Sequence, residues 1–218
     1  MRRTLLLGVL MIAASIPGRS LGQPAIISEI APTGKLRVAM NAATAVLLTR
    51  TPDGKITGGV GVELGKFMAG KFGAVLELVA YPNSSTYTET FGKGEWDIGF
   101  GPKTPLTAEK ADFIADVLLN DYWFIAAPGR EFANAAQVDR PGVKIGVGLN
   151  SSSDQFLSRT LKSAELVRGG NSIEALRSGQ VDVWAGSASN IQEVSKRLSG
   201  GKIVPGAFTS DRTMVMRS

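Results

Sequence analysis

Four consecutive polar residues lie between an apolar segment typical of a strand and a segment that begins like a helix. They are Asn150, Ser151, Ser152 and Ser153. At a helix N-terminus the first backbone N–H groups have no partner inside the helix, and the helix dipole favours negative charge there. Hydroxyl and N–H groups that face one point could therefore hold an anionic group of a small molecule. The serines could instead only cap the helix, and both interpretations stay open.

The chain contains no His and no Cys. Their absence excludes a Ser-His-Asp triad, His-ligated zinc, thiolate metal sites and disulfides. Catalysis would have to use carboxylates, Lys or Tyr, and the candidate general acids Glu63, Glu109 and Asp154 read more simply as surface or cap residues. We expect no metal site and no cofactor.

The first residues have the pattern of a secretory signal peptide. Arg2 and Arg3 precede an apolar run over 5–16, and small residues at 20–22 predict cleavage before Gln23. The run is too short to span a bilayer, which takes roughly 20 residues. Residues 1–22 carry three Arg and no acid, so cleavage lowers the formal net charge from +5 to +2. No basic cluster with interleaved aromatics supports nucleic-acid binding.

One short pattern occurs twice, as GEWDIGFG at 94–101 and GQVDVWAG at 179–186. Gly94, Asp97 and Gly101 recur at a constant offset of 85 residues. Each copy has the pattern of a Gly turn followed by a short buried strand, and the aspartates are expected to bind backbone groups in the turn rather than ligand. Two similar α/β halves enclose a cleft, and small ligands bind in clefts between domains.

Strand and helix patterns alternate along the rest of the chain. Strands are expected at 35–40, 74–81, 96–100, 143–149, 164–170 and 181–186, and helices at 61–73, 84–93, 108–115, 151–162, 172–179 and 189–198. The alternation predicts an α/β fold with mostly parallel sheets flanked by helices.

The order of these motifs resembles bacterial extracellular solute-binding proteins of family 3, which serve ABC transporters and are often associated with amino acids. The segments that carry the resemblance are GKLRVAMN, GVGVELGKFMAGKFG, GEWDIGFGPKTPLTAEKA, VKIGVGLNSSSDQF and SIEALRSGQVDVWAG. It implies a two-lobe, type II periplasmic-binding-protein fold, with lobe 1 at 23–126 and again at 203–218, and lobe 2 at 127–202. Family members continue beyond the last strand with helices, so the chain resembles a C-terminally shortened member.

The resemblance implies that the lobes close on a solute held between them. Contacts are expected at strand ends and helix N-termini. These are Asn41 after the first strand, Lys103 and Thr104 after the first repeat strand, the run 150–153, and Ser187 after the second repeat strand. Tyr81, Tyr87 and Tyr122 are also placed to reach the cleft, with packing against the core as the default alternative for each. For Lys103 a solvated turn and for Thr104 a helix cap remain open alternatives.

Two positions depart from the pattern of amino-acid binders. Lys110 stands where those proteins have an Arg that grips the α-carboxylate, and Lys lacks the planar fork of Arg. Ser187 stands where they have an Asp that holds the α-ammonium group. A neutral or anionic organic solute therefore fits as well as an amino acid.

The resemblance leaves two function classes open. The first is a periplasmic, monomeric receptor that delivers a small solute to an ABC permease in the inner membrane. The second is a dehydratase-like enzyme on the same fold that acts on a cyclic carboxylic acid, since fold alone does not settle function. The lack of His and Cys favours the receptor.

Overall fold

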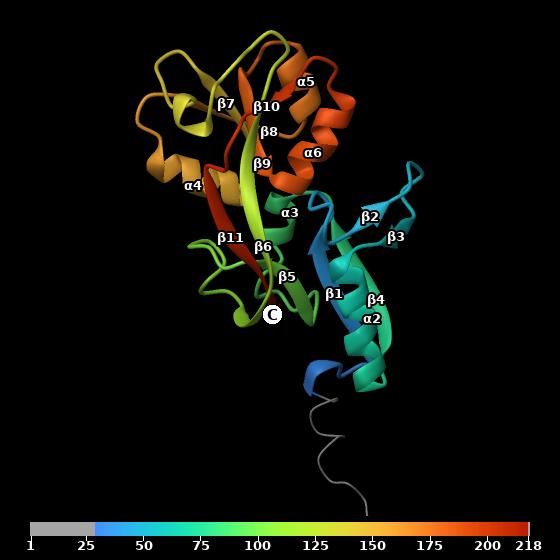
Figure 1. Cartoon of the computed structure of the whole chain (residues 1–218). Helices are drawn as coiled ribbons and strands as arrows, with labels where there is room; N and C mark the ends of the chain where they lie inside the picture. Colours follow the sequence, from blue (N-terminus) through green and yellow to red (C-terminus); the bar gives the residue numbers. More distant parts are fainter. Residues whose placement is uncertain (1–28, 218) are drawn as a thin grey trace, which may run out of the picture.

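The computed structural model describes residues 29–217, so the predicted signal peptide and its cleavage point lie outside the described residues (Figure 1). Nine strands form one sheet in the order β4-β1-β5-β11-β6-β9-β7-β8, with β10 also paired to β6. The strands of this sheet are β1 (Lys35–Asn41), β4 (Val75–Tyr81), β5 (Ile98–Pro102), β6 (Asp112–Ala126), β7 (Lys144–Gly148), β8 (Glu165–Gly169), β9 (Val183–Ser187), β10 (Lys202–Ile203) and β11 (Thr209–Arg217).

Helices and a small hairpin complete the described fold. The helices are α2 (Val60–Phe72), α3 (Ser84–Thr88), α4 (Ser152–Thr160), α5 (Ser172–Arg177) and α6 (Ala188–Arg197), with a 3-10 turn over Ala135–Gln137. The hairpin pairs β2 (Thr49–Arg50) with β3 (Ile56–Gly58). None of the helices in residues 29–217 is long and apolar enough to cross a membrane.

The sheet divides into two parallel groups that belong to two lobes (Figure 1). In the first lobe β1 pairs in parallel with β4 and β5, and in the second β7 pairs in parallel with β8 and β9. The lobes have separate apolar cores, one centred on Leu36, Val38 and Phe100 and the other on Ile145 and Val183. The prediction of a two-lobe α/β fold is confirmed.

Two antiparallel strands join the lobes. β11 pairs with the first part of β6 over Asp112–Tyr122, and the remainder of β6, Tyr122–Ala126, pairs with β9. Tyr122 is opposite both Thr209 of β11 and Ser187 of β9, so it marks the point where the sheet passes from one lobe to the other. The lobe boundaries at 126/127 and 202/203 stay a prediction.

The helix expected at 108–115 is wrong. Turns occupy residues 105–110, and β6 begins at Asp112. The Thr107 hydroxyl donates to the Pro102 carbonyl at 3.0 Å and accepts the Thr104 N–H at 3.0 Å, which fixes the turn. The following backbone then pairs with β11, and such long-range pairing overrides local helix propensity.

The aspartates of the repeated pattern make equivalent hydrogen bonds and ion pairs in the two lobes. Asp97 accepts the backbone N–H of Arg37 at 2.8 Å, and Asp182 accepts the backbone N–H of Lys144 at 2.8 Å. Each carboxylate also binds a guanidinium at 2.6 Å, Asp97 that of Arg37 and Asp182 that of Arg130. The repeat therefore holds the start of the central strand in each lobe. Its aspartates bind backbone groups as expected, but these belong to the neighbouring strand and not to the turn.

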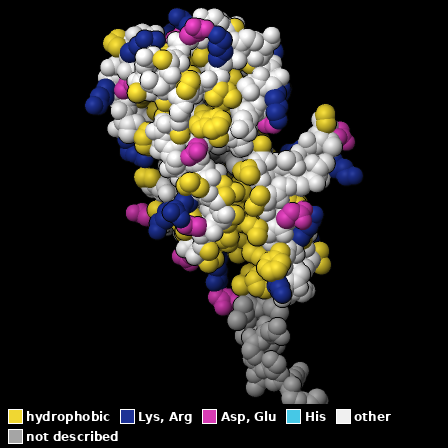
Figure 2. Space-filling model, viewed as in Figure 1, with side chains coloured by type: hydrophobic (Ala, Val, Ile, Leu, Met, Phe, Trp, Pro, Cys, Tyr) yellow, Lys and Arg dark blue, Asp and Glu magenta, His cyan; other side chains and the backbone are white. Residues whose placement is uncertain are grey.

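Apolar side chains gather on one face of the first lobe beside α2 (Figure 2). Around the core of this lobe, the partly buried apolar residues include Leu64, Met68 and Phe72 of α2 and Val117 and Val215 of the crossover strands. This face is the most apolar surface visible in that view.

Candidate functional site

A cavity of about 750 Å³ lies between the two lobes. Its lining includes the ends of β1, β5, β7, β8 and β9, the N-termini of α3, α4, α5 and α6, and the crossover strands. Because the carboxyl ends of parallel strands in the two lobes face each other, polar groups from both lobes converge on this space.

Seven of the ten predicted site residues line the cavity. They are Asn41, Thr104, Asn150, Ser151, Ser152, Ser153 and Ser187. That the seven come together follows from their common position after a strand. Contact with a ligand stays a prediction for each.

The other three predicted residues lie outside the lining. The Tyr81 hydroxyl donates to the Glu95 carboxylate at 3.1 Å, and its ring stacks on Tyr87. The Lys103 ammonium group lies 5.9 Å from the centre of the Phe113 ring. Lys110 is exposed in the turn that replaces the expected helix, which takes it away from the cleft.

The Asn150–Ser153 run has the geometry of a constrained helix start. Asn150 has a φ of 59°, in the left-handed region that non-glycine residues rarely adopt. The Ser151 hydroxyl accepts the Asp154 N–H at 3.1 Å, so Ser151 does cap α4. The Ser153 hydroxyl, in a residue that is 1% exposed, has no hydrogen-bond partner in the described part of the chain. A buried polar group without a partner is rare and points to a missing one.

Other predicted residues are partly used within the protein. The Asn41 amide donates to Ser84 at 2.9 Å, and Ser187 caps α6 by accepting the Asn190 N–H at 3.4 Å. Across the cleft the Asn150 amide donates to Ser85 of α3 at 3.3 Å. The two lobes therefore touch at the cavity edge.

Sequence reasoning missed several lining residues, among them Ser84, Ser85, Asn120, Arg168 and Thr213. Arg168 stands near the end of β8, so the strand-end rule could have found it. Asn120 and Thr213 meet only through the pairing of β6 and β11, where the Asn120 amide donates to the Thr213 hydroxyl at 2.6 Å. Local sequence carries no signal for that pairing.

The cavity lining mixes polar with apolar and aromatic side chains and is nearly without charge. Among the described lining residues Arg168 alone carries a formal charge. Burial raises the pKa of the Tyr122 hydroxyl well above its usual value, and the nearby Asp211 carboxylate raises it further. The hydroxyl donates to Asp211 at 2.8 Å and so remains a protonated donor. Residues 29–217 contain no group of three or more carboxylates placed to hold a metal ion.

No family profile matches the sequence, and no curated protein matches it significantly. Solved structures do match the fold. An ancestral amino acid-binding protein described as a precursor of cyclohexadienyl dehydratase is 21% identical, with a TM-score of 0.72 over 88% of this chain and 85% of that chain. Holo ArgBP from T. maritima is 17% identical, with a TM-score of 0.75 over 87% of this chain and 85% of that chain. The lysine complex of a putative ABC-transporter binding component from Wolinella succinogenes is 15% identical, with a TM-score of 0.73 over 85% and 83%.

The chain has the two-lobe fold of these binding proteins. At these identities the comparison concerns the fold alone, and it confirms the fold that the motif order implied. Within this binding-protein fold the cavity occupies the space between the lobes, as ligand sites in open α/β sheets generally do.

Proposed function

We propose that the chain is the solute-binding component of an ABC transporter and closes its two lobes around a small polar or anionic organic solute. The observation that carries the proposal is the cavity of about 750 Å³, which is lined from both lobes. Within residues 29–217 the crossover strands β6 and β11 join these lobes. When a ligand site is divided between two lobes, binding of the ligand favours the closed arrangement of the lobes, because each lobe contributes part of the binding energy.

The fold neighbours support this class of function. One is described as an amino acid-binding protein, another as ArgBP and a third as a transporter binding component with lysine. On this proposal the chain acts in the periplasm as a monomer and delivers its solute to a permease in the inner membrane. The signal-peptide pattern of residues 1–22 supports export.

The enzyme alternative has less support. The described lining contains no Asp, Glu or Lys, and neither Glu63 nor Glu109 is part of it. Asp154 is 5% exposed and already accepts hydrogen bonds from Asn150, Ser158 and Arg168. The titratable side chains left in the lining as general acids are Tyr87 and Tyr122, whose hydroxyls already donate to the Ala39 carbonyl and to Asp211.

A thermal melt with a panel of amino acids, dicarboxylates, aromatic acids and polyamines tests the proposal. A solute at 100 times its Kd adds about 2.7 kcal/mol to the free energy of unfolding. That raises Tm by roughly 5–10 °C for a chain of this size. The proposal expects one solute class to raise Tm and to be recovered unchanged. A cooperative melt that no solute shifts would contradict it, and chemical conversion of the solute would favour the enzyme.

A further inference from the structure

We propose that Arg168 selects the charge of the solute, and that the cleft takes a small organic anion, such as a carboxylate, on its guanidinium. The inference rests on the proposed solute-binding function and names the class of solute. Arg168 takes the place of Lys103 and Lys110 as the expected cationic contact, because both lysines lie outside the cavity lining.

The hydrogen bonds of Arg168 hold its guanidinium in place and leave one edge available. Nε donates to the Asp154 carboxylate at 2.9 Å, and Nη2 donates to the Ser158 hydroxyl at 2.8 Å. The opposite edge is formed by Nη1 and the second N–H of Nη2, and no residue of 29–217 accepts a hydrogen bond from it. A guanidinium is planar with five donors, so one edge can be anchored while the other binds a carboxylate in a two-pronged way.

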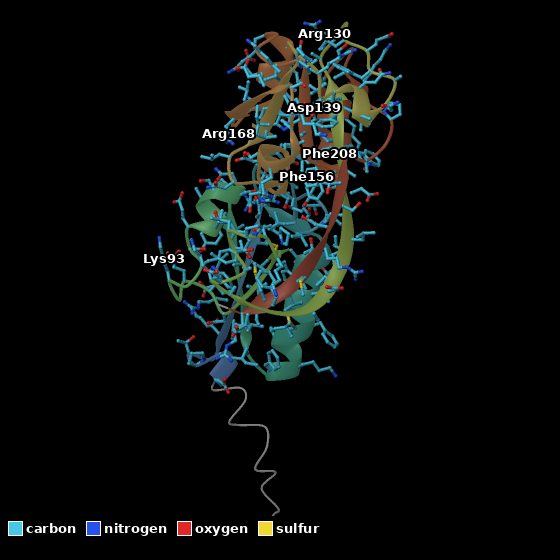
Figure 3. The ribbon with its side chains drawn as sticks, turned by 90° about the vertical axis from the view of Figure 1, so that its left-hand side faces the viewer. Lys93, Arg130, Asp139, Phe156, Arg168 and Phe208 are labelled. Carbon is cyan, nitrogen blue, oxygen red and sulfur yellow. The ribbon has the colours of Figure 1, made fainter. Side chains whose placement is uncertain are left out.

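Asp154 positions this guanidinium and does not compete for the solute. It is 5% exposed, and its oxygens accept from the Asn150 N–H and the Ser158 hydroxyl as well as from Arg168. The side chain of Arg168 is 46% exposed and lines the cavity (Figure 3 labels it in the upper lobe). The pair thus has a buried, satisfied anion on one side and an accessible cation on the other.

A second set of donors lines the same cavity at the N-terminus of α4. The backbone N–H groups of Ser152 and Ser153 have no hydrogen-bond partner in the described part of the chain, and neither has the buried Ser153 hydroxyl. Asp154, which fixes Arg168, belongs to the first turn of this nine-residue helix. An oxyanion satisfies such donors and gains from the helix dipole.

Counter-charges for a cation are missing from the cavity. No Asp or Glu is part of the described lining. Asp211 lies behind it, but its oxygens accept from Asn120 at 3.1 Å and from Tyr122 at 2.8 Å. The ammonium group of a zwitterionic amino acid would lie without a partner near Arg168, and an unpaired charge in a closed cleft is costly. Hydroxyl and amide groups remain for the neutral part of the solute.

Calorimetric titration of the protein expressed from the complete sequence tests the inference. Probes are succinate and 4-hydroxybenzoate, their neutral amides, and the zwitterions glutamine and arginine. At least one anion should bind more tightly than its amide and than the amino acids, and added salt should weaken it. Arg168→Gln should weaken binding of that anion by roughly 10- to 100-fold, since a hydrogen-bonded charge is lost. The same variant should change the binding of the neutral amide little.

Arg130→Gln is the matched control. Arg130 forms an ion pair with Asp182 at 2.6 Å in the same lobe, and Asp182, 13% exposed, is also left without its cation, but neither residue lines the cleft. This variant should keep anion affinity. If Arg168→Gln does not fold, Arg168→Lys retains a positive charge beside Asp154, and loss of the planar fork should still weaken anion binding.

Two outcomes would overturn the inference and leave the receptor standing. One is equal anion affinity in wild type, Arg168→Gln and Arg168→Lys, and the other is a wild-type preference for an amino acid or an amide. Failure of every probe to bind a cooperatively folded wild-type protein would overturn the proposed function together with the inference.

Discussion

At the scale of single residues, the two aspartates of the repeated pattern show how the sequence specifies the lobes. Asp97 is 8% exposed at its side chain and holds both the backbone and the guanidinium of Arg37. Its counterpart Asp182 holds the backbone of Lys144 and the guanidinium of Arg130. The repeat could be read from the sequence. The partners could not, because they are on strands distant in the chain.

Replacing Asp97 by Ala should lower the free energy of unfolding by roughly 2–3 kcal/mol, since it leaves a backbone N–H and a guanidinium without their acceptor. Asp182→Ala should have a similar effect. Denaturant titration measures the loss, with Glu63→Ala as control. Glu63 pairs with Lys66 on the surface, where such a pair contributes less than about 0.5 kcal/mol. An unchanged denaturation midpoint in Asp97→Ala would contradict this role.

A second prediction at the scale of residues concerns Asp139 and the pH dependence of stability. Burial alone would raise its pKa, but the backbone N–H groups of Ala164, Lys162 and Ser163 bind the carboxylate and hold its pKa below the usual value. A carboxylate with a depressed folded-state pKa stabilises the fold above its unfolded pKa of about 3.9, and this contribution disappears as pH falls through the folded value. Asp139 is labelled in the upper lobe of Figure 3.

Asp139→Asn should therefore be less stable than wild type near neutral pH, and the difference should shrink below about pH 4. Urea midpoints across this range measure it. Asp53→Asn, in the exposed turn between β2 and β3, is the control and should follow wild type. A difference between Asp139→Asn and wild type that stays constant down to about pH 3 would exclude the predicted linkage.

At the scale of elements, the spacing of apolar residues and the glycines at segment ends predicted most strands and helices. The helix expected at 108–115 was wrong because the first part of β6, Asp112–Tyr122, pairs with β11 about a hundred residues later in the chain. The two glycines of β7 differ in the space around them, which could not be predicted from the sequence. A Cβ on Gly146 would lie 2.3 Å from the Trp184 ring, whereas one on Gly148 would lie 3.9 Å from Ser151.

Gly146→Ala should destabilise the protein by about 1–3 kcal/mol or more, because the Trp184 ring or the strand must move. Gly148→Ala, two residues along the same strand, should remain within about 1 kcal/mol of wild type. Thermal or urea unfolding of both variants makes the comparison. Equal stability of the two variants would show that β7 and Trp184 are not packed as described.

At the scale of the whole molecule, the cleft follows from the topology. Residues that end parallel strands in two lobes must meet between them, which is why the strand-end rule placed seven predicted residues in the lining. Tyr81 ends β4 and Lys103 follows β5, yet neither lines the cavity, so a position at a strand end does not by itself bring a side chain into the cleft. Lys110 depended on the course of a turn, which local sequence determines poorly. Arg168 follows the same rule as the seven, and its significance appears only with its Asp154 partner in place.

The central claim is that the lobes close on a solute, and an interlobe distance tests it most directly. The chain has no Cys, so Lys93→Cys in the first lobe and Arg159→Cys in the second, both exposed, can carry spin labels at unique positions. Pulsed electron resonance would compare the distance distribution without solute and with a saturating solute found in the melt. The account predicts a shorter and narrower distribution with solute; an unchanged distribution at saturation would contradict closure.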